Sequence, residues 1–371
     1  MSYLIRRAMP QDNTAILDLV ARTPQQGLLR LNFERDPDFH AGACVSCEDP
    51  DIWIAEHGDA PGRSGRPAPV VAVINIGLRA VYLNGAVRRL RYGHDLRIDP
   101  AHRGGMLLHR IFRRLRAELL PEEWMQTVIL DGNDLSLSTV GSGRAGMPTY
   151  YPHGMIETHL VFTAGRRRPR AIDGIDVRRA RCGDMPVMQA FLDAEGPRRQ
   201  FFPKYDLGRL LTEDRYYIGL RPDNFLLAFD GDVLVGMAGD WDQSAFKRTR
   251  VLAYPGVLRW LRHGYNAWGA LTGGMRLPEA GECFRYRSLH TVLAKDNDPH
   301  VFRALLDHSL AGNADCEALA CAFFAGDPLT AALAKHRRRC MRSRHFLVCY
   351  GGDPRARIDG RLLPYVDVAR L

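Results

Sequence analysis

The chain has 371 residues, of which 46% are hydrophobic and 25% charged, and this is the composition of a globular protein long enough for about two domains. No apolar run of about 18 residues occurs, which excludes a transmembrane helix, and the first residues lack the apolar stretch of a secretory signal, so we expect a cytoplasmic protein. The net charge of +9 is dispersed and is not interleaved with aromatic residues, so we do not expect a nucleic-acid partner.

Eight cysteines are spread along the chain. In a chain without a secretory signal, they indicate reduced thiols rather than a disulfide framework. Cys44 and Cys47 form one C-x-x-C pair, but a zinc site needs a second pair of ligands at similar spacing. We therefore expect no metal cofactor.

The first predicted elements are a short strand at 4–8 and a helix at about 14–21, for which Asp12 or Asn13 supplies the N-terminal cap. After a second helical stretch, alternating apolar and polar residues predict strands on both sides of the Asn-Gly pair at 84–85. This dipeptide between two alternating segments is a strong indication of a β-hairpin.

The strand after this hairpin leads into DLRIDPAHRGG (95–105), in which a proline stop is followed by a basic turn with two glycines. Residues 106–119 then carry apolar side chains at helical spacing, and 127–132 is a predicted buried strand. A helix-like segment at 149–155 precedes a final strand at 157–165.

Part of this pattern occurs twice. Three segments return later in the chain, in the same order and at similar spacing: IRRAMPQDNTAILDLV (5–20) as VRRARCGDMPVMQAFL (177–192), WIAEHGD (53–59) as LLAFDGD (226–232), and HDLRIDP (94–100) as HTVLAKD (290–296). Three ordered matches indicate two copies of one fold. We predict a first domain at 1–165, a linker at 166–174 and a second domain at 175–371.

The second copy contains an insertion at about 243–287. Its aromatic and arginine residues predict an amphipathic helical element, which could serve as a lid, a dimer contact or a substrate-binding surface. A homodimer is therefore one possible assembly.

The basic turn has the features of an anion site. Successive N–H groups at a helix N-terminus have no partner within the helix, and the helix dipole adds positive potential there. Glycines let a pyrophosphate approach the backbone closely, and Arg103 adds charge. The turn is therefore predicted to bind a phosphate group.

The order of elements, the central hairpin and the strand–basic turn–helix unit resemble the GCN5-related N-acetyltransferase fold, here in tandem. The resemblance implies an α+β architecture in which each domain has a mixed, mostly antiparallel sheet flanked by helices. The family's turn begins with Arg or Gln, has Gly fourth and has Gly or Ala sixth. The turn commonly follows a strand that ends in x-Pro-x-x-Arg-Gly, and 98–104 matches this lead-in well. In the turn itself, Met106 and Leu108 stand where small residues are usual.

The resemblance also implies a function, which is transfer of an acetyl group from acetyl-CoA to a primary amine of a small molecule or peptide. The implied coenzyme-binding residues are Ile98, Arg103, Gly104, Gly105, Met106, Leu107 and Leu108. The family's second pattern, Tyr-x-x-x-Gly, falls on Tyr150 and Gly154, so Tyr150 is the implied acid for the thiolate, with Tyr151 as the alternate.

The sequence does not decide which group is the general base. The strand before the turn offers His94, Asp95 and Asp99, and the end of the next buried strand offers Asp131 and Asp134. His94 has a suitable unperturbed pKa, and Asp131 ends a strand where the family's sheet separates. A chain of water molecules can also serve as the base.

In the second copy the same strand is followed by NDPHVFRALL (297–306). Asp296 and Asp298 repel a pyrophosphate, Pro299 removes an amide donor, and no glycine opens the turn. We therefore expect no acetyl-CoA there and expect this half to shape the acceptor pocket or a dimer face.

The sequence leaves two alternative functions open. One is a non-catalytic binding or scaffold module in which both copies are degenerate. The other is a tandem relative that takes an aminoacyl group from charged tRNA, which the positive charge favours and the coenzyme turn does not.

Overall fold

The computed structural model describes residues 2–25, 29–58, 68–120, 122–133, 136–138, 146–164, 169 and 172–371. The first part of the chain contains β1 (Tyr3–Arg7), α1 (Asn13–Arg22), β2 (Arg30–Glu34), α2 (Phe39–Ser46), β3 (Ile52–His57), β4 (Val70–Asn75), β5 (Leu78–Leu83), β6 (Ala86–Ile98), α3 (Leu107–Arg116), β7 (Trp124–Leu130) and β8 (Thr149–Phe162).

The second part follows a similar order. It contains β9 (Asp176–Arg179), α5 (Met185–Glu195), β10 (Arg199–Gln200), β11 (Phe225–Asp230), β12 (Val233–Trp241), β13 (Arg248–Ala253), α6 (Leu258–Thr272), β14 (Tyr286–Ala294), α7 (Pro299–Gly312), β15 (Ala318–Phe324), β16 (Arg338–Cys349) and β17 (Leu363–Pro364). Among the described residues, no helix has the length and apolar character needed to cross a membrane.

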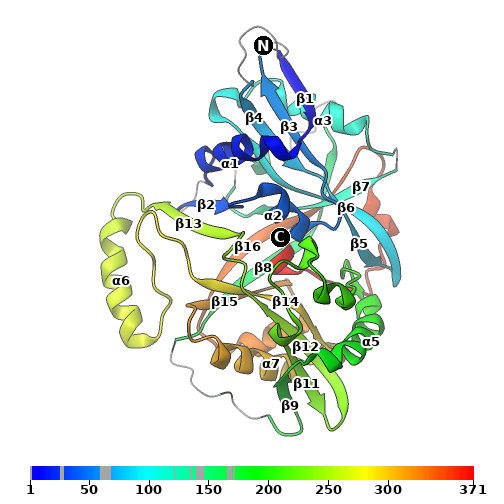
Figure 1. Ribbon diagram of the computed structural model, residues 1–371, viewed down its shortest axis with the longest axis vertical. Coiled ribbons are helices and arrows are strands. Elements are labelled where there is room, and N and C mark those ends of the chain that lie inside the picture. Colours follow the sequence, from blue (N-terminus) through cyan, green and yellow to red (C-terminus); the bar gives the residue numbers. More distant parts are fainter. Residues whose placement is uncertain are drawn as a thin grey trace.

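A single 13-stranded sheet runs through the molecule in the order β1-β3-β4-β6-β7-β16-β8-β15-β14-β12-β11-β9, with β5 paired to β6. Figure 1 shows it running from β1 at one end to β9 at the other. The β6–β7 and β14–β15 pairs are parallel, and the other pairs of this sheet are antiparallel. This mixed, mostly antiparallel sheet with flanking helices is the predicted α+β architecture.

The two halves of the chain exchange strands at the centre of the sheet. The late strand β16 lies between β7 and β8, and β8 in turn pairs with β15 of the second half. The β16–β8 ladder runs from the Arg338–Val161 pair to the Cys349–Thr149 pair. Each half therefore completes its sheet with a strand from the other. The division of the chain into domains at 1–165 and 175–371 therefore remains a prediction. Most of the proposed linker lies outside the described residues.

The internal repeat has a repeated structural basis. Arg6 donates two hydrogen bonds to Asp12, at 2.7 and 2.9 Å, and Arg178 donates two to Asp184, at 2.7 and 2.8 Å. Each aspartate also accepts the N–H of the residue three positions before it. The same motif thus closes the same strand-to-helix turn in both halves.

The prediction that Asp12 or Asn13 caps the first helix was wrong, because both side chains bind elsewhere. The Asp12 carboxylate faces back to Arg6 and to the Met9 N–H and does not cap α1. The Asn13 side chain accepts the N–H of Phe39 and so joins α1 to α2.

The Asn84-Gly85 hairpin is confirmed, because Leu83 pairs with Ala86 and both turn residues have positive φ. The helix-like segment at 149–155 is instead the start of β8. Tyr150 pairs with Val348 and Tyr151 with Leu347 on β16. These aromatic side chains pack across a strand that comes almost 200 residues later, which local periodicity does not reveal.

Separate apolar clusters lie under the helices on the sheet. The α3 cluster holds Leu107, Ile111, Phe112 and Leu115 with Phe346 and Val348 of β16. On the other face of β16, Leu347 packs with Val81, Leu90 and Trp124 of the first half. The exchanged strand therefore contributes to the core of the first half on both faces.

We predict that Leu347→Ala destabilises the whole molecule rather than one half. The side chain is fully buried, so the substitution should lower the free energy of unfolding by about 2–5 kcal/mol. Because β16 belongs to both halves of the sheet, chemical denaturation should still show one transition, moved to lower denaturant.

The matched control is Met341→Ala, at an exposed position on the same strand, which should change stability by about 0.5 kcal/mol or less. Two separate transitions, of which Leu347→Ala moves only one, would contradict a shared sheet.

Candidate functional site

The basic turn joins β6 to α3. β6 ends at Ile98, and the Asp99 carboxylate accepts the N–H of Ala101 at 3.0 Å and pairs with Arg22 at 2.8 Å. Arg103 donates from Nε to the carbonyl of Ile98 at 2.9 Å, which closes the turn. Gly104 follows with a φ of +76°, a conformation that favours glycine.

The turn presents free N–H groups at the start of α3. In the described part of the chain, the amides of Gly104, Gly105 and Met106 donate to no backbone or side-chain acceptor. A Cβ placed on either glycine would meet no atom within 4 Å. The Met106 side chain is 60% exposed, whereas Leu107 and Leu108 pack into the α3 cluster. The backbone is thus accessible to an anion.

The matching turn of the second half is closed. There the Asp298 carboxylate accepts the N–H of His300 at 2.7 Å and caps α7, whose first residue is Pro299. Asp296 pairs with Arg198 at 2.9 Å, and the Asn297 side chain accepts a hydrogen bond from Arg199. A carboxylate of the chain therefore occupies the helix end that a phosphate would need.

Each half also has a place where two parallel strands separate. β6 and β7 pair only from Arg91–Met125 to Gly93–Thr127, and β14 and β15 pair only from Tyr286–Ala318 to Ser288–Ala320. Just beyond, Asp95 and Thr291 have φ values of +52° and +54° at matching positions. The ladders of β6 and β14 with their antiparallel neighbours shift register in the same region, so each strand carries a bulge.

The bulge of the second half is occupied by the chain itself. The N–H of Thr291 donates to Asp367 at 2.9 Å, and the N–H of Val292 donates to the Tyr365 hydroxyl at 3.1 Å. Arg370 is buried beside them, over the Tyr216 ring and within 3.0 Å of His290 Nε2. Residues 365–370 therefore fill the region next to the bulge.

In the first half the bulge carries a buried charged group instead. Asp95 pairs with Arg35 at 3.1 Å and accepts from His94 Nδ1 at 3.0 Å. Burial alone would raise the pKa of Asp95, but Arg35 and His94 outweigh it and hold this pKa below its usual value. Burial lowers the pKa of His94, whose Nε2 lies 3.8 Å from Cys47 Sγ. His94 is thus a neutral, inward-facing imidazole.

Sequence reasoning missed a lysine from the second half in this region. The Lys247 ammonium donates to the Leu371 carbonyl at 2.7 Å. Burial, with the positive charge of Arg35, lowers its pKa to about 7. The neighbouring strand β13 pairs with β2, where Arg250 binds Glu34 at 2.6 Å. Only this pairing of distant segments brings Lys247 near Arg35, so no sequence pattern predicts it.

The other predicted residues lie on β7 and β8. Tyr150 packs in the α3 cluster with Leu107 and Leu108, and burial raises its pKa. Tyr151 faces the opposite side of β8, packed near Trp124. Asp131 follows β7 and pairs with Arg344 at 2.9 Å. Asp134 lies outside the described residues.

No family model matches the sequence, and no curated protein matches it. Solved structures do match. A GCN5-related N-acetyltransferase from Sphaerobacter thermophilus has a TM-score of 0.53 and 13% identity, over 100% of this chain and 98% of that one. A putative acetyltransferase from Pyrococcus horikoshii has a TM-score of 0.51 and 10% identity, over 99% and 95%.

A third match is a GCN5-related glucosamine N-acetyltransferase region of a fungal multi-domain β-N-acetylglucosaminidase, with a TM-score of 0.57 and 7% identity, over 94% of this chain and 38% of that one. The chain has the GCN5-related N-acetyltransferase fold. The fold predicted from the motif order is thereby confirmed.

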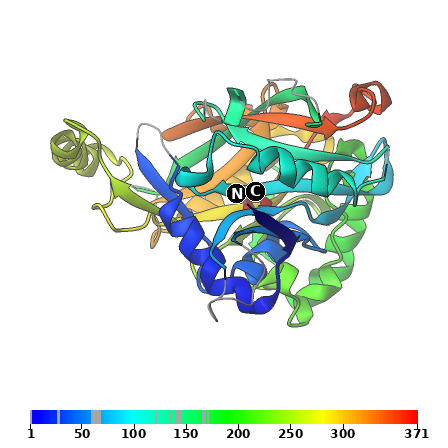
Figure 2. The ribbon, with the colours of Figure 1, turned by 90° about the horizontal axis from the view of Figure 1, so that it is seen from above.

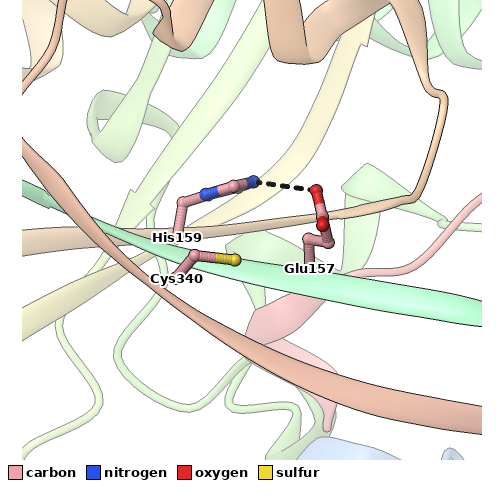
Figure 3. A group of neighbouring side chains, drawn as sticks. All are labelled: Glu157, His159 and Cys340. Atoms are coloured by element: carbon pink, nitrogen blue, oxygen red, sulfur yellow. Dashed lines mark ion pairs between the residues drawn. The ribbon is translucent and has the colours of Figure 1, made fainter.

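Within this acetyltransferase fold, three possible metal ligands meet on the central strands (Figure 3). Ligand atoms of Glu157, His159 and Cys340 all lie within 4.8 Å of one another. Arg342 donates to Glu157 at 3.2 Å. Burial lowers the pKa of His159, and the positive charge of Arg338 lowers it further. A cation would have to displace one arginine and approach another, so these surroundings do not favour a metal.

We predict that His290 makes stability depend on pH. Arg370 donates to its Nε2, and Nδ1 faces the Thr291 hydroxyl, so the buried ring is neutral. Burial lowers its pKa to about 3, below the unfolded value of about 6.5. The unfolded chain therefore binds more protons between these values, and stability falls as the pH falls through this range.

The contribution of His290 is roughly 1.4 kcal/mol for each pH unit below about 6.5. Urea unfolding at several pH values should show that His290→Gln loses less stability in acid than the unaltered chain. The slopes of the free energy of unfolding against pH should differ by the equivalent of about one bound proton. Equal slopes for the two proteins would show that His290 does not titrate in this way.

Proposed function

We propose that the protein is an acyl-CoA-dependent N-acetyltransferase that moves an acetyl group to a primary amine of a small molecule or peptide. One observation carries the proposal: among the described residues, the amides of Gly104, Gly105 and Met106 at the N-terminus of α3 have no acceptor, and the two glycines face open space. In the acetyltransferase fold this turn is the proposed coenzyme site, and its chemistry suits a pyrophosphate.

The residues of the turn have separate tasks in this proposal. The amides of Gly104, Gly105 and Met106 donate to phosphate oxygens, and Arg103 adds positive charge beside them. Leu107 and Leu108 fix the start of α3 by packing into the core, so Leu108 does not cover the amides. Met106 extends into solvent. The two departures from the family pattern are therefore compatible with an open site, which weakens the scaffold alternative.

The transfer forms a C–N bond and breaks the C–S bond of the thioester, which is the activated group that the coenzyme supplies. The amine must lose a proton and the leaving thiolate must gain one. We propose Tyr150 as the acid, because it shares the α3 cluster with the turn and a tyrosine hydroxyl is protonated at neutral pH. Tyr151 is on the other face of the strand.

For the base, we propose His94, acting through water, rather than Asp131. The His94 ring is held neutral by burial and is oriented by Asp95 at 3.0 Å. Asp131 is instead engaged in an ion pair with Arg344 at 2.9 Å.

The coenzyme site is tested by calorimetry with acetyl-CoA. Gly105→Glu places a carboxylate beside the open amides, and its Cβ would meet no described atom within 4 Å. Affinity should therefore fall at least about tenfold through charge repulsion. Arg103→Gln should weaken binding less, because the amides remain.

Gly183→Glu is the matched control, since this glycine in the second half also faces open space and carries the same change of charge. It should bind acetyl-CoA like the unaltered protein. Absence of binding by the unaltered protein, or an equal loss in both variants, would contradict the proposed site.

The acid is tested by turnover. With acetyl-CoA and a panel of primary amines, release of free thiol by Tyr150→Phe should be slower by on the order of 100-fold, with unchanged coenzyme affinity. Tyr151→Phe, on the opposite face of the same strand, should keep normal turnover. Normal turnover of Tyr150→Phe would remove this residue from the mechanism.

A further inference from the structure

Helix α6 has an apolar face that nothing in the described chain covers. Figures 1 and 2 both show α6 at the outer end of an arm, away from the central sheet. Five large apolar side chains on it are between 60% and 88% exposed. They are Val257, Trp260, Leu261, Trp268 and Leu271. Scattered exposed apolar residues are ordinary in soluble proteins, but a continuous stripe of this size is not.

The polar side of α6 is the side that faces the protein. Asn266 accepts the N–H of Leu277 at 2.8 Å and donates to its carbonyl at 2.9 Å. Arg262 pairs with Glu279 at 3.2 Å, and Gly269 is the only buried residue of the helix. The inner side also holds Leu258 and Tyr265, which are half-buried, but the large apolar side chains of the stripe point outward, which is the reverse of an ordinary surface helix.

The spacing of the stripe is that of a helix pair. Val257, Leu261, Gly264, Trp268 and Leu271 follow one another at alternating intervals of four and three residues. This is the repeat of a coiled-coil seam, in which two helices pack along one face. A second helix is thus the occupant that the spacing fits.

Apart from Leu261, whose counterpart is the small residue Ala267, the order of side chains along the stripe is symmetric about Gly264. Trp260 and Trp268 lie at equal distances on either side of it, and so do Val257 and Leu271. Two antiparallel copies of α6 that cross at Gly264 would therefore pair tryptophan with tryptophan and aliphatic with aliphatic. A two-fold interface needs such a self-complementary surface. Glycine at the crossing point allows the two backbones to approach closely, and Gly264 faces open space.

A hollow next to Trp260 also favours this helix pairing. It has a volume of about 660 Å³, and its lining includes Tyr254, Arg259, Trp260, His263 and Glu279. In the antiparallel arrangement, Trp268 of a second copy lies opposite Trp260, beside this hollow. A tryptophan entering a pocket is a common energetic centre of an interface.

The exposed apolar surface is large enough for a dimer. A tryptophan buries about 150–250 Å² and an aliphatic side chain roughly 100 Å², so these five partly exposed side chains offer roughly 500 Å² per copy. Two copies would bury about 1,000 Å², which is the size from which a specific interface can be argued. The arm is also held firmly, because β13 pairs with β2 and Arg250 binds Glu34.

We propose that α6 is a homodimerisation helix that pairs with α6 of a second copy, antiparallel and crossing at Gly264. Arg259 lies over the Trp260 ring and, with Glu279, lines the hollow beside the seam. The seam positions themselves, Val257, Leu261, Gly264, Trp268 and Leu271, are uncharged. The proposal does not depend on acetyl transfer, since it concerns a surface outside the coenzyme turn.

Sedimentation velocity over a wide range of concentration tests the dimer. The unaltered protein should be a dimer, and Leu261→Glu or Leu271→Glu should weaken association about 30-fold or more. Ala270→Glu is the matched control: it puts the same charge on an exposed residue of the same helix outside the stripe, and it should remain a dimer. Because the stripe is outside the core, all three variants should have the melting temperature of the unaltered protein when they are compared at a concentration low enough to dissociate the dimer.

The geometry is tested by crosslinking in a Cys182→Ser, Cys340→Ser background, which removes the exposed thiols of the described chain. Gly264→Cys should form a disulfide-linked dimer on mild oxidation, because the symmetry places this position opposite itself. Val257→Cys should not crosslink to itself but should crosslink to Leu271→Cys when the two are mixed.

A monomer at all concentrations would overturn the proposal. So would a monomer that sediments with vesicles of phosphatidylglycerol and phosphatidylcholine and is released by Leu271→Glu, because the stripe would then be a membrane-binding surface. Self-crosslinking of Val257→Cys would replace the antiparallel arrangement with a parallel one.

Discussion

The antiparallel pairing of β16 with β8 is the constraint on which the molecule depends. β8 ends the first half of the chain and β16 comes late in the second, yet each lies against the other half's parallel strand pair. Removing either strand would leave a long edge of unpaired N–H and C=O groups and an exposed apolar face. The first half therefore needs β16 of the second half to complete its sheet, whether or not the second half binds a ligand.

This dependence accounts for the asymmetry between two copies of one fold. The first half keeps an open, glycine-lined helix end after β6, and its bulge carries a buried ion pair between Asp95 and Arg35. In the second half, Asp298 caps the helix and the segment 365–370 occupies the bulge. The same backbone features thus serve a proposed ligand site in one half and internal packing in the other.

Much of this could be predicted from sequence, because it is local. The repeat of Arg6 and Asp12 as Arg178 and Asp184 is visible in the sequence, although the ion pairs that they form were not predicted, and the Asn84-Gly85 turn depends on two residues. The strand at 149–155 could not be predicted, because its partner is almost 200 residues away. The approach of Lys247 to the first half depends on β13–β2 pairing, and the exchange of β8 and β16 depends on the whole topology.

The central claim is that one coenzyme binds per chain, at the turn before α3. Hydrogen–deuterium exchange with and without acetyl-CoA tests it directly. The amides of Gly104, Gly105 and Met106 donate to no acceptor in the part of the chain that the structure describes, so they should become protected when they donate to a ligand. The account predicts protection of peptides covering 103–108 and no change in those covering 295–300. Protection at 295–300, or at neither turn, would contradict it.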